Sequence, residues 1–179
     1  MDGKTVANLA ISQGAGKAAA LTGQDIVFDK GFRDICQSNG CGNYGKCHMC
    51  PPDVGGIEEL IRQARAFENA VMYQTVYTIE DSFDFEGMQA AGDAFNLCAR
   101  RIQAKAGELL HVPWMHLAAG GCRTCEACAK REELPCRNPA EALASLEAYG
   151  IDVYKTSSSA GLKYANGANT VTYFGMLLY

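Results

Sequence analysis

The sequence lacks the features that mark several large classes of protein. It has no excess of basic residues, because 16 Lys and Arg stand against 20 Asp and Glu and the formal net charge is -4. Proteins that bind nucleic acids by neutralising phosphates carry a basic face, so we expect no nucleic-acid partner. No apolar run approaches the length of about 20 residues that a membrane-spanning helix needs, so we expect no membrane span.

The N-terminal residues, Met-Asp-Gly-Lys-Thr, lack the basic-then-apolar order of a signal peptide. We therefore expect a cytoplasmic protein, whose thiols stay reduced. Charged residues make up only 20% of the chain and hydrophobic residues 48%, which is enough to bury a core. A chain of 179 residues fits a single domain, residues 1–179.

A complete phosphate-binding loop is also missing. Gly16-Lys17 matches part of the motif G-x-x-x-x-G-K-[ST], but Ile11 stands where its first glycine belongs and Ala18 where Ser or Thr belongs. We expect residues 1–24 to form an N-terminal arm or a helix rather than a nucleotide site.

Cysteine, in contrast, is abundant. The chain has nine, and all except Cys98 lie in the segments 36–52 and 122–139. The odd number and the lack of a secretion signal argue against disulfides, and clustered cysteines in a reducing compartment are typical of metal ligands. Exposed clusters and thiolates oxidise readily, so we expect an anaerobic host.

The segment 122–139 predicts an iron–sulfur site. Its spacing, C-x2-C-x2-C with a fourth cysteine and a following proline, is close to the bacterial run C-x2-C-x2-C-x3-C-P. The last gap is seven residues here instead of three. The predicted ligands are Cys122, Cys125, Cys128 and Cys136. Structural zinc is the alternative.

The segment 36–52 predicts a second site. Three glycines separate its cysteines and permit backbone amides to turn toward anionic sulfurs, and Pro51-Pro52 stiffens the exit. The predicted ligands are Cys36, Cys41, Cys47 and Cys50. This spacing is less regular, so Cys47 is the least secure of the four. His48 is a substitute for it in a zinc or mixed site, or else an exposed loop histidine.

The periodicity of apolar residues predicts an α/β fold, with a mixed sheet of about four to five strands and flanking helices. Helices are expected at 57–67 (capped by Asp53), 87–111 and 139–149 (with Asn138 as the cap and Gly150 after the end); strands are expected at 26–28, 70–79, 112–118, 151–156 and 170–179, and a loop at 157–169. The order strand, helix, strand over 70–118 predicts a parallel crossover.

Three further residues are expected in the hydrophobic core. Cys98 falls in the apolar stripe of the helix at 87–111, which indicates a core residue. Trp114 and His116 lie in a strand that leads to Cys122, where we expect packed core groups, with the lining of a cluster pocket as the alternative.

The chain resembles a family of predicted metal-binding proteins known as domain of unknown function 2284. The resemblance rests on Cys41-Gly-Asn-Tyr-Gly-Lys leading to Cys50-Pro-Pro, on the cysteine run from Cys122 to Pro139, and on residues 145–153, and it covers roughly residue 26 onward. It implies metal or iron–sulfur binding, mostly in anaerobic prokaryotes, and no established reaction.

Three functions compete. The first is electron transfer by two iron–sulfur clusters, expected to be of the [4Fe–4S] type, to or from a redox partner protein. The basic residues Arg123, Lys130, Arg131 and Arg137 would then offset cluster charge, contact an acidic partner, or simply form a solvated rim. The second is a metalloenzyme with an open cluster iron, served by Tyr44, Lys46 or His48. The third is a zinc-stapled binding module.

Overall fold

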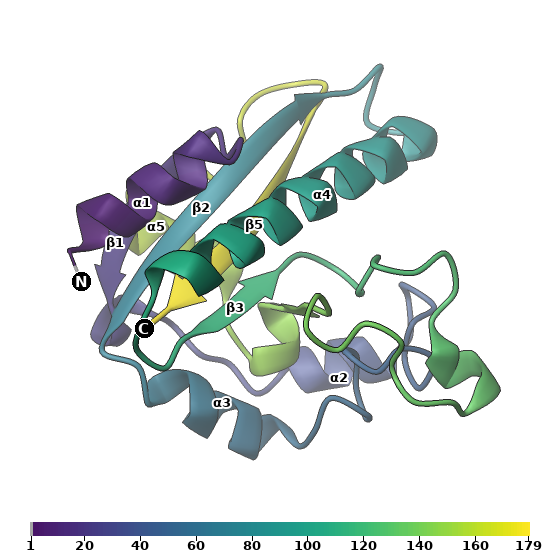
Figure 1. Ribbon diagram of the computed structural model, residues 1–179. Coiled ribbons are helices and arrows are strands. Elements are labelled where there is room, and N and C mark those ends of the chain that lie inside the picture. Colours follow the sequence, from purple (N-terminus) through teal and green to yellow (C-terminus); the bar gives the residue numbers. More distant parts are fainter. Residues whose placement is uncertain (1) are drawn as a thin grey trace.

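Five strands form one mixed sheet with helices on both faces (Figure 1). The computed structural model describes residues 2–179, and the α/β class predicted from the sequence is confirmed. The strands are β1 (Lys17–Thr22), β2 (Asn69–Thr78), β3 (Met115–Ala118), β4 (Ala144–Ser145) and β5 (Thr170–Leu178), in the order β1-β2-β5-β3-β4. The helices are α1 (Gly3–Ser12), α2 (Phe32–Gln37), α3 (Ile57–Arg65), α4 (Phe85–Leu109) and α5 (Val153–Ser159).

The predicted parallel crossover is present, with one addition. β2 and β3 are joined through α4 and are both antiparallel to β5, so they run in the same direction. β5 lies between them, and only β3 and β4 form a parallel pair of neighbours. The strand that comes last in the chain order therefore occupies the middle of the sheet.

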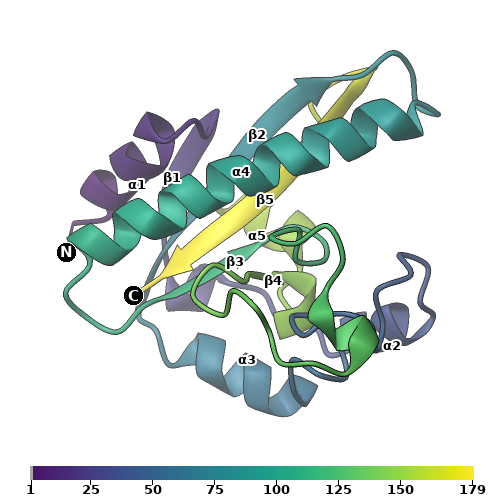
Figure 2. The same cartoon turned by 45° about the vertical axis from the view of Figure 1, so that its right-hand side comes forward.

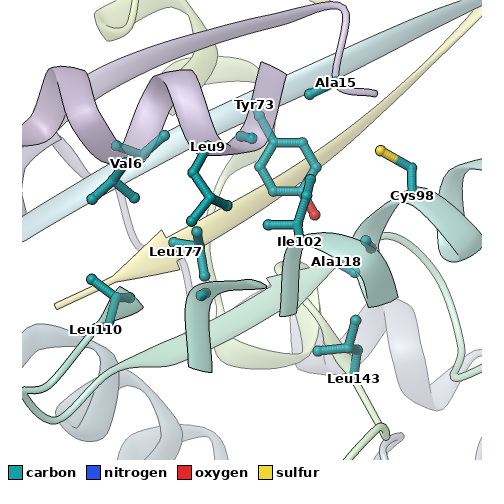
Figure 3. Packing of buried hydrophobic residues seen from close by; sticks show 14 of the residues in the cluster. Val6, Leu9, Ala15, Tyr73, Cys98, Ile102, Leu110, Ala118, Leu143 and Leu177 are labelled. Carbon is teal, nitrogen blue, oxygen red and sulfur yellow. The ribbon is translucent and has the colours of Figure 1, made fainter. Parts of the chain in front are cut away.

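Each face of the sheet packs against its own core, as the alternation of side chains along a strand requires. Val71 and Tyr73 of β2 face α1 and α4, where Ile102 and Leu9 complete the packing (Figure 3). Met72, between them in sequence, faces the opposite core, which α3, α5 and the segment between β4 and α5 cover. Because helices cover both faces, residues 174–178 of the central strand β5 are buried, whereas its first four residues are partly exposed.

The segment between Cys136 and Ser159 differs from its prediction. No helix begins at Asn138 in the described structure. Residues 139–141 form a turn, and the short strand β4 and a 3-10 turn η3 (Glu147–Tyr149) come next. Pairing of β4 with β3 places Leu143 and Ala144 in buried positions, which outweighs the capping signal. The strand predicted at 151–156 is also wrong, because Asp152 caps α5 by accepting a hydrogen bond from the Lys155 amide.

Two smaller predictions need correction. Ile26–Phe28 forms no strand in residues 2–179 but a single bridge, from Phe28 to Ile151. Gly56, not Asp53, precedes α3. The helix expected within residues 1–24 is present as α1, whereas β1 after it was not predicted. Gly16-Lys17 lies between a helix and a strand, in the reverse order to a phosphate-binding loop.

No helix in residues 2–179 combines the length and the apolar character that crossing a bilayer requires.

Candidate metal centre

The two cysteine segments lie side by side at one end of the sheet, next to α2 (Figures 1 and 2). Side-chain contacts join them. His48 Nε2 donates to the Leu134 carbonyl at 2.8 Å, and Lys130 Nζ lies 2.6 Å from Asp53 Oδ1. His48 is therefore partly buried and hydrogen-bonded, unlike the exposed loop histidine considered from the sequence. Asp53, which was expected to cap a helix, instead forms an ion pair between the two segments.

Cysteine thiols from both segments line one pocket. Cys47 comes from the first segment, and the second segment contributes Cys122, Cys125, Cys128 and Cys136. The pocket is also lined by His48, Met49 and Asn138, and its volume is about 20 Å³. A space of that size holds about one water molecule. Anything larger than a single ion would therefore move the thiols apart when it bound.

Polar contacts within the segment 122–139 orient these thiols. Asn138 Nδ2 donates to Cys125 Sγ at 3.3 Å, and Cys122 Sγ lies 3.4 Å from Thr124 Oγ1. Arg137 Nη1 donates to the Ala127 carbonyl at 3.1 Å and so closes the loop around the cysteines. Sequence reasoning assigned Asn138 to a helix cap; its position two residues after Cys136 was the only signal for a role at the thiols.

The contacts around Cys47 lower the pKa of its thiol. It is 2% exposed and accepts hydrogen bonds from the Cys50 and Cys128 thiols and from the Met49 and Cys122 amides. The hydrogen bond from Cys50 is the largest influence, and together these contacts lower the pKa of Cys47 to about 6. The same bond and burial raise the pKa of Cys50 far above its ordinary value. These contacts favour the thiolate of Cys47, which is the form of cysteine that binds metals.

The other cysteines of the first segment surround Cys50 rather than the pocket. Cys36, at the end of α2, is partly buried, Cys41 is exposed and Cys50 is 9% exposed. Burial raises the pKa of Cys36, the nearby Arg33 guanidinium opposes that rise, and Cys41 adds to it. The charges of Cys41 and Cys36 also raise the pKa of Cys50. Cys50 also lies against the second segment, because a Cβ at Gly121 would stand 3.5 Å from its Sγ, so Cys47 and Cys50 both meet that segment.

Most of the basic residues near the second segment are already paired. Arg123 contacts Asp93 at 2.7 Å, Arg137 contacts Glu132 at 3.1 Å, and Lys130 contacts Asp53. Arg131 lines a groove of about 400 Å³ together with Lys46, Lys130 and Glu133. The positive charge free to act on a partner therefore lies in this groove.

Cys98, His116 and Trp114 lie outside the cysteine pocket. Cys98 is 2% exposed and belongs to the core between α1 and α4, as its position in the helix predicted (Figure 3). Trp114 packs on the edge of the same core. The core interpretation of these residues is confirmed.

His116 belongs to a buried chain of hydrogen bonds that ends next to the cysteine loop. Gln103 Nε2 donates to the Ala140 carbonyl, which leaves its Oε1 to accept from His116 Nδ1 at 3.1 Å. His116 Nε2 then accepts from the Tyr73 hydroxyl at 2.8 Å. Both ring nitrogens are satisfied in the neutral imidazole, and burial lowers the pKa of His116 to about 3.

The donor chemistry fits a metal centre, although the thiols do not converge on a point. Across residues 2–179, no three His, Cys, Asp or Glu side chains are grouped so that they could hold a metal ion. A tetrahedral zinc ion binds four ligands at about 2.3 Å from one centre. An iron–sulfur cluster is larger, and thiolates from Cys122, Cys125, Cys128 and Cys136 would hold it around the pocket, with the electron-carrying chemistry supplied by its iron.

Comparison with known proteins gives one match. A family model described as "Predicted metal-binding protein (DUF2284)" matches residues 19–179. No curated protein and no solved structure matches the chain.

Proposed function

Because the chain belongs to the DUF2284 family of predicted metal-binding proteins, we propose that it binds two iron–sulfur clusters of the [4Fe–4S] type and transfers electrons to or from a partner protein. The observation that carries this proposal is the pocket between the segments 36–52 and 122–139. Five thiols line it, and no carboxylate is among the described residues around it. Soft thiolate ligands select iron–sulfur clusters and zinc over magnesium, calcium or manganese.

The sequence spacing favours iron–sulfur clusters over zinc. The run Cys122-x2-Cys125-x2-Cys128 provides three thiols at the intervals of bacterial iron–sulfur proteins, and Asn138 adds a hydrogen bond to Cys125 Sγ. Hydrogen bonds to ligand sulfurs are among the factors that set the reduction potential of such a cluster. We therefore assign the ligands of the cluster in the segment 122–139 to Cys122, Cys125, Cys128 and Cys136.

Electron transfer is supported by the position of the site. The cysteine segments form one end of the molecule outside the sheet, so a partner can approach them closely (Figure 2). The groove beside them carries Lys46 and Arg131 as well as Lys130, whose charge is paired with Asp53, and one acidic residue, Glu133. A partner with an acidic face would be attracted to this groove, and opposite charges raise the rate of encounter more than the final affinity.

Purification without oxygen tests the proposal. We expect brown protein with about eight irons and eight sulfides per chain, and an electron paramagnetic resonance signal after reduction with dithionite. Replacing both Cys122 and Cys125 by Ala should remove about half of the iron and make the segment 122–139 sensitive to proteases. The double variant is needed because a fifth thiol, Cys47, lies in the same pocket.

Cys98→Ala is the matched control, since Cys98 lies in the core away from the pocket. It should keep the full iron content. Colourless protein that contains zinc, or a double variant with undiminished iron, would overturn the proposal.

A further inference from the structure

A groove without an assigned role lies where α4 meets the turn 139–141, and it shares no lining residue with the groove beside Lys46. Its volume is about 320 Å³, at the lower end of the range of about 300–1,000 Å³ that is typical of small-ligand sites. The helix contributes Leu97, Arg100, Arg101 and Ala104 to its lining, and the turn contributes Ala140 and Glu141.

Arg100, on the wall of this groove, has donors that are poorly satisfied. Its Nη1 lies 3.8 Å from Glu141 Oε2, which is too long for a hydrogen bond. Its Nε is buried and has no hydrogen-bond partner within residues 2–179. A guanidinium binds a carboxylate best through two parallel N–H donors, and a buried donor without a partner costs free energy. A carboxylate placed better than that of Glu141 would therefore bind here in its stead.

The charge of the groove also favours an anion. Arg101 Nε and Nη2 both donate to the Gln13 carbonyl, at 3.2 and 3.0 Å. This partner is neutral, so the positive charge of Arg101 still acts in the groove. Glu141 is the one acidic side chain among the described residues that line it, and this side chain is 61% exposed. An exposed ion pair of this kind contributes little free energy, so an added anion displaces it at low cost.

The remaining lining residues are apolar. Leu97 is 49% exposed although it belongs to the same helix as the buried Ile102. Ala104 and Ala140 line the groove with it and add no polar side-chain atom. A ligand that covers Leu97 would remove apolar surface from water, which stabilises the complex. The groove therefore suits a carboxylate that carries an apolar body better than a small inorganic anion.

A single turn separates this groove from the cysteine pocket. Glu141 lines the groove, whereas Asn138 and Ala142, on either side of it in sequence, line the pocket. The Glu141 carbonyl accepts a hydrogen bond from Thr124 Oγ1 at 3.3 Å, and Cys122 Sγ lies 3.4 Å from the same hydroxyl. A change in the way Glu141 is held would therefore reach a thiol of the pocket.

We propose that this groove is an effector site, which binds a small carboxylate with an apolar body. The ligand takes the place of the Glu141 carboxylate on Arg100, and its apolar part lies against Leu97. Release of Glu141 alters the turn and, through Thr124, the surroundings of Cys122. The effect on the cysteine pocket rests on the proposed iron–sulfur function, whereas the binding itself does not.

Benzoate is the probe, and isothermal titration calorimetry on the full chain, purified without oxygen, measures its binding. Saturable binding is expected. Benzamide has the same ring without the charge and should bind about tenfold more weakly or worse, as expected for loss of a charged hydrogen bond. Acetate lacks the ring and should also bind more weakly than benzoate. Inorganic phosphate that binds as tightly as benzoate would overturn the assigned class of ligand.

Two variants should change the affinity in opposite directions. Arg100→Met should weaken benzoate binding about tenfold or more. Glu141→Gln removes the internal competitor and should tighten the binding about threefold or more. Because Glu141 is exposed, this variant tests the site even if Arg100→Met is unstable. Arg62→Met is the matched control, since Arg62 pairs with Glu59 on α3 outside the groove, and it should bind benzoate like wild type.

Electron paramagnetic resonance of the dithionite-reduced protein tests the effect on the pocket. Saturating benzoate should shift the resonance that is lost when Cys122 and Cys125 are replaced by Ala. Glu141→Gln should show a similar shift without any ligand, because its turn is already released from Arg100.

Each part of the inference has its own refutation. Absence of benzoate binding, or equal affinities of wild type, Arg100→Met and Glu141→Gln, would overturn the site. A resonance that bound benzoate leaves unchanged would overturn the effector role. Iron-free protein that still binds benzoate would overturn the proposed function and leave the assignment of the groove standing.

Discussion

Lowering the pH should destabilise this protein through His116. The ring is fully buried between Tyr73 and Gln103, and both of its nitrogens are engaged in the neutral form. Burial lowers its pKa from 6.5 to about 3 in the folded state. Below pH 6.5 the unfolded chain therefore binds a proton that the folded chain does not. The stability that neutral His116 contributes is complete above pH 6.5 and is lost progressively as the pH falls toward 3.

The size of this effect follows from the linkage relation. Each pH unit in this range costs about 1.4 kcal/mol for one proton, so the free energy of unfolding should fall by about 2 kcal/mol from about pH 7 to about pH 5. Trp114 is the one tryptophan of the chain and packs against the core that includes Tyr73, so its fluorescence reports urea unfolding.

His116→Gln provides the control. Other groups titrate over the same range, including Glu147, whose pKa burial raises, but they titrate equally in both proteins. The difference between the two proteins therefore isolates His116, and His116→Gln should lose about 2 kcal/mol less than wild type over this range. Parallel pH profiles for the two proteins would refute the assignment of a neutral buried imidazole.

Two core substitutions give further predictions. Gly175→Ala should lower the free energy of unfolding by about 2 kcal/mol or more, because a Cβ there would lie 2.2 Å from the Tyr73 hydroxyl and break its hydrogen bond to His116. Gly107→Ala is the control, since the nearest atom to a Cβ there is 3.7 Å away. In the same urea titration it should change the free energy of unfolding by less than about 1 kcal/mol. Ile102→Ala, at a fully buried position of α4, should cost about 2–5 kcal/mol, whereas Leu97→Ala on the half-exposed side should cost under about 1; equal losses would contradict the packing of α4.

The elements that sequence predicted well are long and strongly patterned. β2, α4 and β5 each lie within a residue or two of the expected ranges. α4 carries an apolar stripe at helical spacing, and β2 and β5 are long runs rich in β-branched and aromatic residues. β1 was missed because Ala18, Ala19 and Ala20 carry little strand preference, and pairing with β2 determines their conformation.

The prediction for the segment after Cys136 was wrong for a different reason. Asn138, Pro139 and Glu141 satisfy the local requirements of a helix start, but β4 pairs with β3 only if the chain is extended at Ala144. A contact between residues distant in sequence overrode a local signal. Asp152, by comparison, was a readable helix cap, and the apolar residues around it were wrongly given the period of a strand.

The resemblance to the predicted metal-binding family is confirmed. Cys122, Cys125, Cys128 and Cys136, which the spacing grouped together, line one pocket. Spacing could not divide eight thiols between two sites, because that division depends on how the two segments meet. The contact of Cys47 with Cys128, and the hydrogen bond from His48 to Leu134, are consequences of tertiary packing.

The central place of β5 has a consequence for how the protein is made. Residues 170–178 follow both cysteine segments in the chain, yet β3 and β2 meet only through them. While the ribosome is still adding these residues, the thiols have no completed sheet to hold them side by side. Any inorganic cofactor that needs the completed sheet would therefore be inserted after translation of β5, and until then a cell would need to keep the eight thiols reduced.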